Sequence, residues 1–194
     1  MAVVRRQLLP AIVAFVVLTV LTGLAYPLVV TGIAQLAFPG RADGSLVERN
    51  GVVVGSSLIG QRFEGPRWFR PRPSSAGDGY DAMSSSASNL GPTNRTLLRD
   101  VRSRAAAYRR ENGLEAHAPV PPDAVTGSAS GLDPQISVAN ARIQAYRVAR
   151  ARGLSRADVL GLVSAHTHGR SLGFLGQPGV SVVELNLALD GIGR

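Results

Sequence analysis

His166 and His168 come closest in this chain to a metal-binding pattern. The two imidazoles are two residues apart, so one helix face cannot present both, and no carboxylate follows at a helical spacing. Two interpretations remain open for the pair. It could form a weak metal site or a surface cluster at the end of a helix, and the spacing favours the surface cluster.

A second candidate is the run Arg67-Trp68-Phe69-Arg70, within a stretch from Leu58 to Gly91 that lacks periodicity and is rich in Gly, Pro and Ser. Arginines interleaved with aromatic rings can stack on nucleic-acid bases or bind an anion. The alternative is that the aromatic side chains anchor a long loop to the core or to a partner protein. We expect the anchoring role.

The composition excludes several classes of chemistry. All 21 basic residues are Arg, and a phosphate-binding P-loop requires Lys after its glycines. The chain contains no Cys, which excludes disulfides and thiolate metal sites. The formal net charge of +8 raises nucleic acid as a possible partner. The membrane segment described next argues against it, because it predicts that the basic domain lies outside the cytoplasm.

Residues 7–40 contain no charged side chain. An uncharged apolar run longer than about 18 residues is typical of a membrane-spanning helix. Arg5 and Arg6 precede this run, so the positive-inside rule predicts a cytoplasmic N-terminus and an external domain from residue 41 onward. A cleaved signal peptide ending near Gly23-Leu24-Ala25 is the alternative. A retained anchor is favoured because fifteen further uncharged residues, 26–40, follow Ala25.

One face of the predicted helix carries small and hydroxyl-bearing side chains, namely Thr19, Thr22, Gly23 and Tyr26. Such faces allow another helix to approach closely and to form hydrogen bonds. Pro27 removes a backbone donor, so a kink is expected near Gly23. A single span with such a face indicates a subunit of a larger complex. The predicted organisation is therefore a membrane anchor over residues 1–40 and one α+β domain over residues 41–194.

Within residues 41–194, local signals predict both strands and helices. Asn50-Gly51 between apolar runs predicts a β-hairpin over residues 44–56. Helices are expected from Thr93 to Asn112, from Ser137 to Arg152 and from Ser155 to about His166. The apolar face of the first comprises Leu97, Leu98, Val101, Ala105 and Tyr108. The apolar face of the second comprises Ala141, Ala145, Val148 and Ala149. Strands are expected at residues 124–126 and at 183–190, where Val183, Leu185, Leu187 and Leu189 alternate.

Several short blocks resemble a known family. They are Gly55-Ser56-Ser57-Leu58-Ile59-Gly60-Gln61, Ser88-Asn89-Leu90-Gly91-Pro92-Thr93-Asn94, Ala129-Ser130-Gly131-Leu132-Asp133-Pro134, Gly176-Gln177-Pro178 and Val183-Glu184-Leu185-Asn186-Leu187-Ala188-Leu189-Asp190, with Tyr26-Pro27 in the membrane helix. In this order they resemble the C subunit (KdpC) of potassium-transporting P-type ATPases.

The resemblance implies an accessory, non-catalytic subunit of a high-affinity potassium uptake complex in the bacterial inner membrane. Its implied partners are a channel-like potassium-binding subunit, an ATP-hydrolysing P-type subunit and a small single-span subunit. Potassium would be the transported ion, and ATP would be bound with the hydrolysing subunit. The rival hypothesis is a membrane-anchored extracytoplasmic solute-binding protein or enzyme, which would require a convergent polar pocket.

The resemblance also implies two competing roles. In one, the subunit supports assembly and stability of the complex. In the other, it is a catalytic chaperone that raises the ATP affinity of the hydrolysing subunit, with Gln144 contacting the nucleotide. The predicted topology places Gln144 across the membrane from cytoplasmic ATP, which favours assembly. A structural role for Gln144 beside Arg147 is the corresponding alternative to nucleotide contact.

Overall fold

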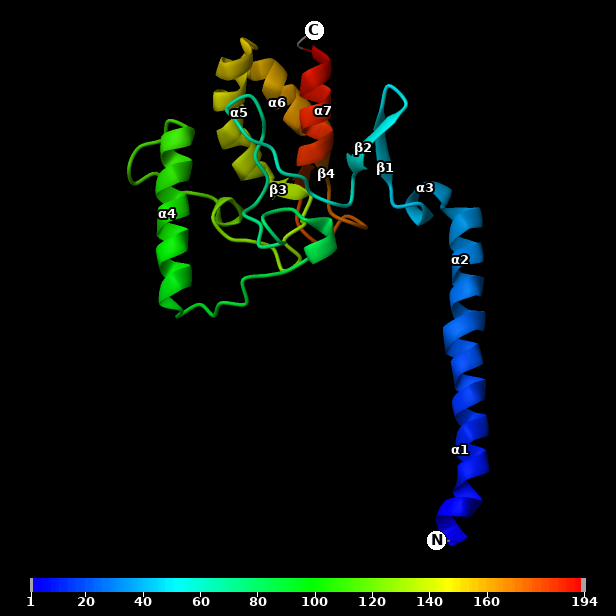
Figure 1. Cartoon of the computed structure of the whole chain (residues 1–194). Helices are drawn as coiled ribbons and strands as arrows, with labels where there is room; N and C mark the ends of the chain where they lie inside the picture. The colour runs from blue at the N-terminus through cyan, green and yellow to red at the C-terminus, as the bar shows by residue number, and fades with distance from the viewer. Residues whose placement is uncertain (1, 193–194) are drawn as a thin grey trace. The chain divides into compact units, whose positions relative to one another are not determined.

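The computed structural model describes residues 2–192, with side chains from residue 6 onward. The chain divides into two compact units, one ending at Leu46 and the other beginning at Val47. The first unit contains α1 (Ala2–Val20), the π-helical turn η1 (Leu21–Ala25), α2 (Tyr26–Ala37) and the short α3 (Pro39–Ala42) (Figure 1). Within the 32-residue stretch Arg6–Ala37, an 18-residue window has a mean hydropathy of 2.5 and none of it is buried, so the stretch is long and apolar enough to cross a membrane.

The irregularity expected near Gly23 takes the form of the π-helical turn. Pro27 has no backbone N–H, and the preceding Tyr26 N–H bonds to the carbonyl of Leu21, five residues back. Thr19 and Gly23 share one side of the helix, because a Cβ added to Gly23 would lie 4.0 Å from Thr19 Cγ2. The Thr22 hydroxyl donates to the Leu18 carbonyl at 2.7 Å, within its own helix. The small-residue face is therefore present and uncovered.

The predicted hairpin is confirmed as β1 (Leu46–Arg49) and β2 (Val52–Ser56), which form a two-stranded sheet. Asn50 and Gly51 have φ of 52° and 76°, as a two-residue turn of type I′ requires. Arg49 on β1 forms an ion pair with Asp190 near the C-terminus. This contact ties the hairpin to the rest of the second unit.

The centre of the second unit is a small antiparallel sheet in the order β3 (Gln135–Ser137), β5 (Gly179–Ser181) and β4 (Thr167–His168). Ile136 on β3 lies opposite Val180 on β5, and both are buried. Three helices, α5 (Val138–Arg152), α6 (Arg156–Ala165) and α7 (Val182–Ile192), lie close to this sheet (Figure 1). The buried core joins these elements through small and branched side chains: Ala141, Ala145, Val148, Val159, Val163, Val182, Leu185 and Leu189.

The predicted strand at 183–190 is wrong, because these residues lie in α7. Alternate apolar positions suggested a strand, but the buried residues are Val182, Val183, Leu185, Asn186 and Leu189. Four of them, Val182, Leu185, Asn186 and Leu189, have the spacing of one helix face. Leu187, expected in the core, is only half-buried. Leu, Ala and Glu also have high helix propensity, which the alternating pattern concealed.

The helices predicted at 137–152 and 155–166 are confirmed as α5 and α6. Ser137 and Ser155 cap them through side chains that accept hydrogen bonds from Asn140 N and Asp158 N. Gly153 ends α5 in the left-handed conformation, with φ of 68°. The expected apolar face of α5 is buried as predicted.

The first predicted helix is α4 (Arg95–Glu111), which lies apart from the other helices of the unit (Figure 1). Its N-cap is Asn94, whose side chain accepts from Thr96 N, so the helix begins two residues after Thr93, where it was predicted to begin. Tyr108 is buried, but Leu98 is 42% exposed, so the expected apolar face is covered mainly near its C-terminal end.

The predicted strand at 124–126 is also wrong, because a 3-10 turn, η3 (Pro122–Ala124), occupies this position. Pro121 and Pro122 fix two φ angles, and Thr126 folds back to bond the Pro122 carbonyl. Among the described residues of the irregular stretch from Leu58 to Gly91, the one helical segment is the 3-10 turn η2 (Ala82–Ser84). Residues 2–192 thus contain one apolar helical segment that could span a membrane, followed by an α+β domain, as the sequence predicted.

Candidate functional site

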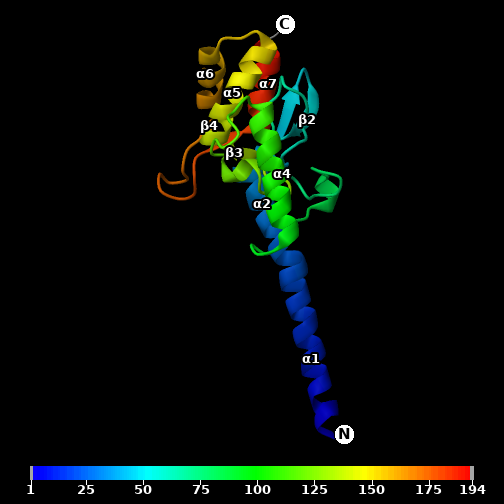
Figure 2. The same cartoon turned by 90° about the vertical axis from the view of Figure 1, so that its left-hand side faces the viewer.

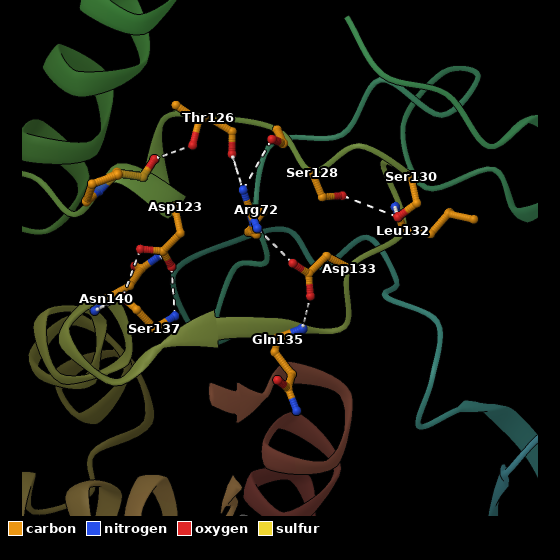
Figure 3. A network of polar contacts seen from close by, with 12 residues as sticks. Arg72, Asp123, Thr126, Ser128, Ser130, Leu132, Asp133, Gln135, Ser137 and Asn140 are labelled. Carbon is orange, nitrogen blue, oxygen red and sulfur yellow. Dashed lines mark hydrogen bonds and ion pairs between the residues drawn. The ribbon is translucent and has the colours of Figure 1, made fainter. Parts of the chain in front are cut away.

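Gln144 lies on α5, one turn after Asn140, and a half-buried carboxylate fixes the start of this helix. Asp123 accepts hydrogen bonds from Ser137 N and Ser137 Oγ, both at 2.8 Å, and from Asn140 Nδ2 at 2.9 Å (Figure 3). Asn140 Oδ1 in turn accepts from the hydroxyl of Tyr108 on α4 at 2.8 Å. These bonds fix the orientation of the Asn140 amide, which then meets Gln144.

Gln144 is 2% exposed, and its amide is fully occupied by the protein itself. Its Oε1 accepts from Arg70 N at 2.7 Å and from Arg147 Nη2 at 2.8 Å. Its Nε2 donates to Arg70 O at 3.0 Å and to Asn140 Oδ1 at 2.9 Å. A glutamine amide has two donor hydrogens and two acceptor lone pairs, so each has a partner here.

Asn186 on α7 holds the neighbouring residue in the same manner. Its Oδ1 accepts from Phe69 N and its Nδ2 donates to Phe69 O, both at 2.9 Å. The Phe69 side chain is completely buried in the core. Two buried amides from different helices therefore hold consecutive backbone residues of the irregular stretch, as a neighbouring strand would.

Two arginines on α5 complete this attachment. Arg147 donates to the carbonyls of Gly65, Pro66 and Trp68 at 3.3, 2.8 and 3.0 Å. Burial lowers the pKa of Arg147, and the nearby charge of Arg70 lowers it further. Burial and the Arg70 charge therefore both disfavour the protonated guanidinium of Arg147. In this structure Arg147 binds backbone carbonyl oxygens.

Arg152 lies over the Trp68 ring, with its guanidinium carbon 4.4 Å from the ring centroid. Arg152 also donates to the carbonyls of Arg67 at 2.8 Å and Leu189 at 3.0 Å. With Phe69 in the core and one face of Trp68 covered, the aromatic run anchors the loop. The structure thus supports the anchoring interpretation rather than a stacking platform.

A cleft of about 540 Å³ lies between α4, α5 and the irregular stretch. Its charged lining comprises Arg62, Arg70, Arg72, Arg104, Arg147, Glu64, Asp78 and Glu111. Several of these charges are already paired. Arg70 contacts both oxygens of Glu111 at 2.7 Å, and Arg62 contacts Glu64 at 2.7 Å.

Arg72, which lines this cleft, is the centre of a polar network. Arg72 donates to Asp133 at 2.8 Å and to the carbonyls of Thr126 and Gly127 at 3.4 and 3.2 Å (Figure 3). The Tyr80 hydroxyl donates to the Arg72 carbonyl at 2.7 Å. Burial raises the pKa of Tyr80 and of Tyr108, so both phenols are neutral at pH 7.

The two histidines have separate partners. His166 Nδ1 lies 2.9 Å from the Leu162 carbonyl at the end of α6, and His168 Nε2 lies 3.3 Å from Glu184. Within residues 2–192, no group of three or more His, Asp or Glu side chains is placed to hold a metal ion. The histidines thus take part in local helix-end and inter-element contacts.

Sequence reasoning missed Asn186, Asp123 and Asn140, all of which hold the loop or α5. Asn186 lies in the segment predicted as a strand, in which only the alternating apolar residues were expected in the core. A buried Asn is normally hydrogen-bonded, as Asn186 is here. Asp123 and Asn140 gave no comparable signal. Asp123 bonds Ser137 and Asn140, 14 and 17 residues away, and Asn140 bonds Tyr108, 32 residues away.

Comparison with known proteins identifies the family. The family described as KdpC, K+-transporting ATPase, c chain, matches residues 8–191. A "Potassium-transporting ATPase KdpC subunit" of Mycobacterium tuberculosis is 60% identical over 186 residues, covering 96% of this chain and 98% of the relative.

Proteins with the same name in more distant bacteria agree. The Rhodospirillum rubrum protein is 55% identical over 185 residues, covering 95% of both chains. The Caulobacter vibrioides protein is 56% identical over 185 residues, covering 95% of this chain and 92% of the relative. These matches favour a transporter subunit over an anchored enzyme or solute-binding protein. The chain belongs to the KdpC family of K+-transporting ATPase c chains.

Proposed function

We propose that this chain is a non-catalytic accessory subunit that assembles and stabilises a high-affinity, ATP-driven potassium uptake complex. Its partners are a channel-like potassium-binding subunit, an ATP-hydrolysing P-type subunit and a small single-span subunit. The proposal rests on the family and on the names of the relatives, which place such subunits in a potassium-transporting ATPase.

The observation that carries the assembly role is the uncovered helix Arg6–Ala37. It is long enough to cross a bilayer, and it carries Thr19 beside Gly23, which lies in the π-helical turn η1. Adding a Cβ to Gly23 would meet no closer atom of the chain than 4.0 Å, so its own fold does not require glycine there. Close approach of a second helix would require it. We therefore assign this face to the channel-like subunit.

The proposed orientation follows from charge. Arg5 and Arg6 remain in the cytoplasm, and the basic α+β domain lies outside the inner membrane. Because the chain has no Cys, a single Cys at Met83, which is 93% exposed, reports the side directly. A membrane-impermeant maleimide should label it in intact cells whose outer barrier is permeabilised. Labelling only after the inner membrane is broken would contradict this topology.

We propose that any increase in ATP affinity reaches the hydrolysing subunit through assembly of the complex. The nucleotide contact implied for Gln144 stays a prediction of the family resemblance. To bind a nucleotide, the Gln144 amide would have to give up some of its four hydrogen bonds within the chain. Breaking such bonds in a buried site costs free energy, which supports the structural role.

The test of helix docking is a substitution on the small-residue face. Gly23→Leu should strongly reduce co-purification with the channel-like subunit, because the larger side chain prevents close approach. Ala25→Leu is the matched control, since it adds a similar volume two residues further on, on the opposite side of the helix. Equal co-purification of both variants with the channel-like subunit would overturn the docking proposal.

A further inference from the structure

The segment of residues 169–178, here called the β4–β5 loop, exposes apolar side chains. Leu172 is 82% exposed, Phe174 68% and Leu175 50%. Figure 2 shows this orange segment projecting from the rest of the unit. Contiguous apolar surface on a folded domain commonly marks an interaction site.

The β4–β5 loop has a defined shape. Ser171 and Leu175 exchange two backbone hydrogen bonds, each of 2.9 Å, and Gly173 N donates to Arg170 O at 3.1 Å. These bonds close a tight turn with Leu172 and Phe174 at its outer end. A turn ordered before binding loses less conformational entropy when it docks.

Leu172 adopts an unfavourable backbone conformation, with φ of 54°. A bulky residue in the left-handed region is an outlier that costs free energy. Its side chain points into solvent and gains nothing from burial within the domain. Strain of this kind, with an exposed apolar side chain, indicates a surface shaped for something outside the domain.

We propose that the β4–β5 loop docks into an apolar pocket, with a carboxylate at its rim, on another protein subunit of the complex. This inference rests on the proposed function, which supplies the partner subunits. Leu172 and Phe174 fill the pocket, and the exposed Arg170 pairs with the carboxylate.

The charge of the loop favours a protein partner over the bilayer. Arg170 is the only charged residue among residues 169–178, whereas segments that bind anionic lipid carry clusters of roughly four to eight basic residues. A fluid lipid interface also does not require a fixed turn or a strained Leu172. A pocket of complementary shape does require a defined turn.

The test uses the full chain with one Cys added, because the native sequence has none. Ser171→Cys retains Leu172, Phe174 and Leu175 and places the thiol on an exposed residue of the turn. Ser103→Cys, an exposed site on α4, is the matched control. Labelling by an impermeant maleimide is measured for the isolated chain in nanodiscs and for the co-expressed complex in nanodiscs.

We expect the labelling rate at position 171 to fall about tenfold or more on assembly, as for a residue entering a well-packed interface. The rate at position 103 should change less than about twofold, as for a surface outside that interface. Adding Leu172→Gly, which suits the positive φ and removes the apolar side chain, should restore most of the labelling at 171.

Two results would overturn the inference. One is unchanged labelling at 171 in a complex that contains the chain. The other is protection at 171 already in the isolated chain in nanodiscs, which would assign the loop to lipid. If the wild-type chain failed to co-purify with the complex, the proposed function itself would fail. Co-purification therefore separates the two failures.

Discussion

Two irregular segments of this protein use their apolar side chains in opposite ways. Residues 61–81, here called the anchored segment, place Phe69 in the core and stack Trp68 beneath Arg152. The β4–β5 loop, residues 169–178, leaves Leu172 and Phe174 in solvent. Both segments are rich in Gly and Pro, and the helices and strands described above all lie outside them.

The difference lies in where the partners are. The anchored segment is held by side chains far along the chain: Gln144 and Arg147 on α5 and Asn186 on α7. In the β4–β5 loop, backbone hydrogen bonds join residues 170–175 to one another. A segment that binds its own domain is part of the scaffold. A segment closed on itself with apolar side chains outward is available to another protein.

The largest expected effect is at Phe69. Phe69→Ala should lower the free energy of unfolding by about 3–5 kcal/mol, because it leaves a cavity in the core. Phe174→Ala is the matched control and should change it by less than about 0.5 kcal/mol. Urea unfolding of the full chain in detergent, followed by fluorescence of the single Trp68, measures both. Equal losses would remove the distinction between the segments.

Gln144→Ala should cost about 2–4 kcal/mol, since it removes the hydrogen-bond partner of the Arg70 backbone N–H and C=O and of Arg147 Nη2. Gln177→Ala in the exposed β4–β5 loop should be close to neutral in the same unfolding measurement. A near-neutral Gln144→Ala would show that its four hydrogen bonds contribute little to the fold.

Arg152→Met should lower stability by about 1–2 kcal/mol, because it removes the cation–π contact with Trp68 and two hydrogen bonds to carbonyls. Trp68 fluorescence should also shift in the folded state. Arg170→Met in the β4–β5 loop should leave stability unchanged. Thermal unfolding of the two variants side by side would reveal any exception.

The smallest expected effect is a gain. Leu172→Gly should raise the free energy of unfolding by about 0.5 kcal/mol, since relief of the left-handed strain exceeds the entropy cost of glycine. Leu175→Gly, without positive φ in the native turn, should be destabilising or neutral. A loss of stability in Leu172→Gly would mean that Leu172 contributes to its own domain.

Local signals were sufficient for part of this fold. Asn50-Gly51 specified the hairpin, and Ser137 with Gly153 bounded α5, because each depends on residues nearby in the sequence. The alternation of Val183 to Asp190 was misleading, since Leu185 and Leu189 fit both a strand and a helix. Only the burial of Val182 and Asn186 decides between the two, and burial depends on the whole core.

The attachment of the anchored segment could not be predicted from sequence. Gln144 bonds Arg70 and Asn186 bonds Phe69, across separations of 74 and 117 residues. No local pattern specifies such pairs. The resemblance singled out Gln144 for nucleotide binding, whereas its geometry gives it a structural partner for every donor and acceptor.

The central claim is that Gln144 and Asn186 have equivalent structural roles in holding the anchored segment. It is tested most directly by the KM for ATP of assembled complexes that contain Gln144→Ala or Asn186→Ala in this chain. Because both variants release the same segment, we predict that the two KM values agree within about twofold. A KM raised about tenfold by Gln144→Ala, with the wild-type value retained by Asn186→Ala, would contradict the claim and support direct nucleotide contact.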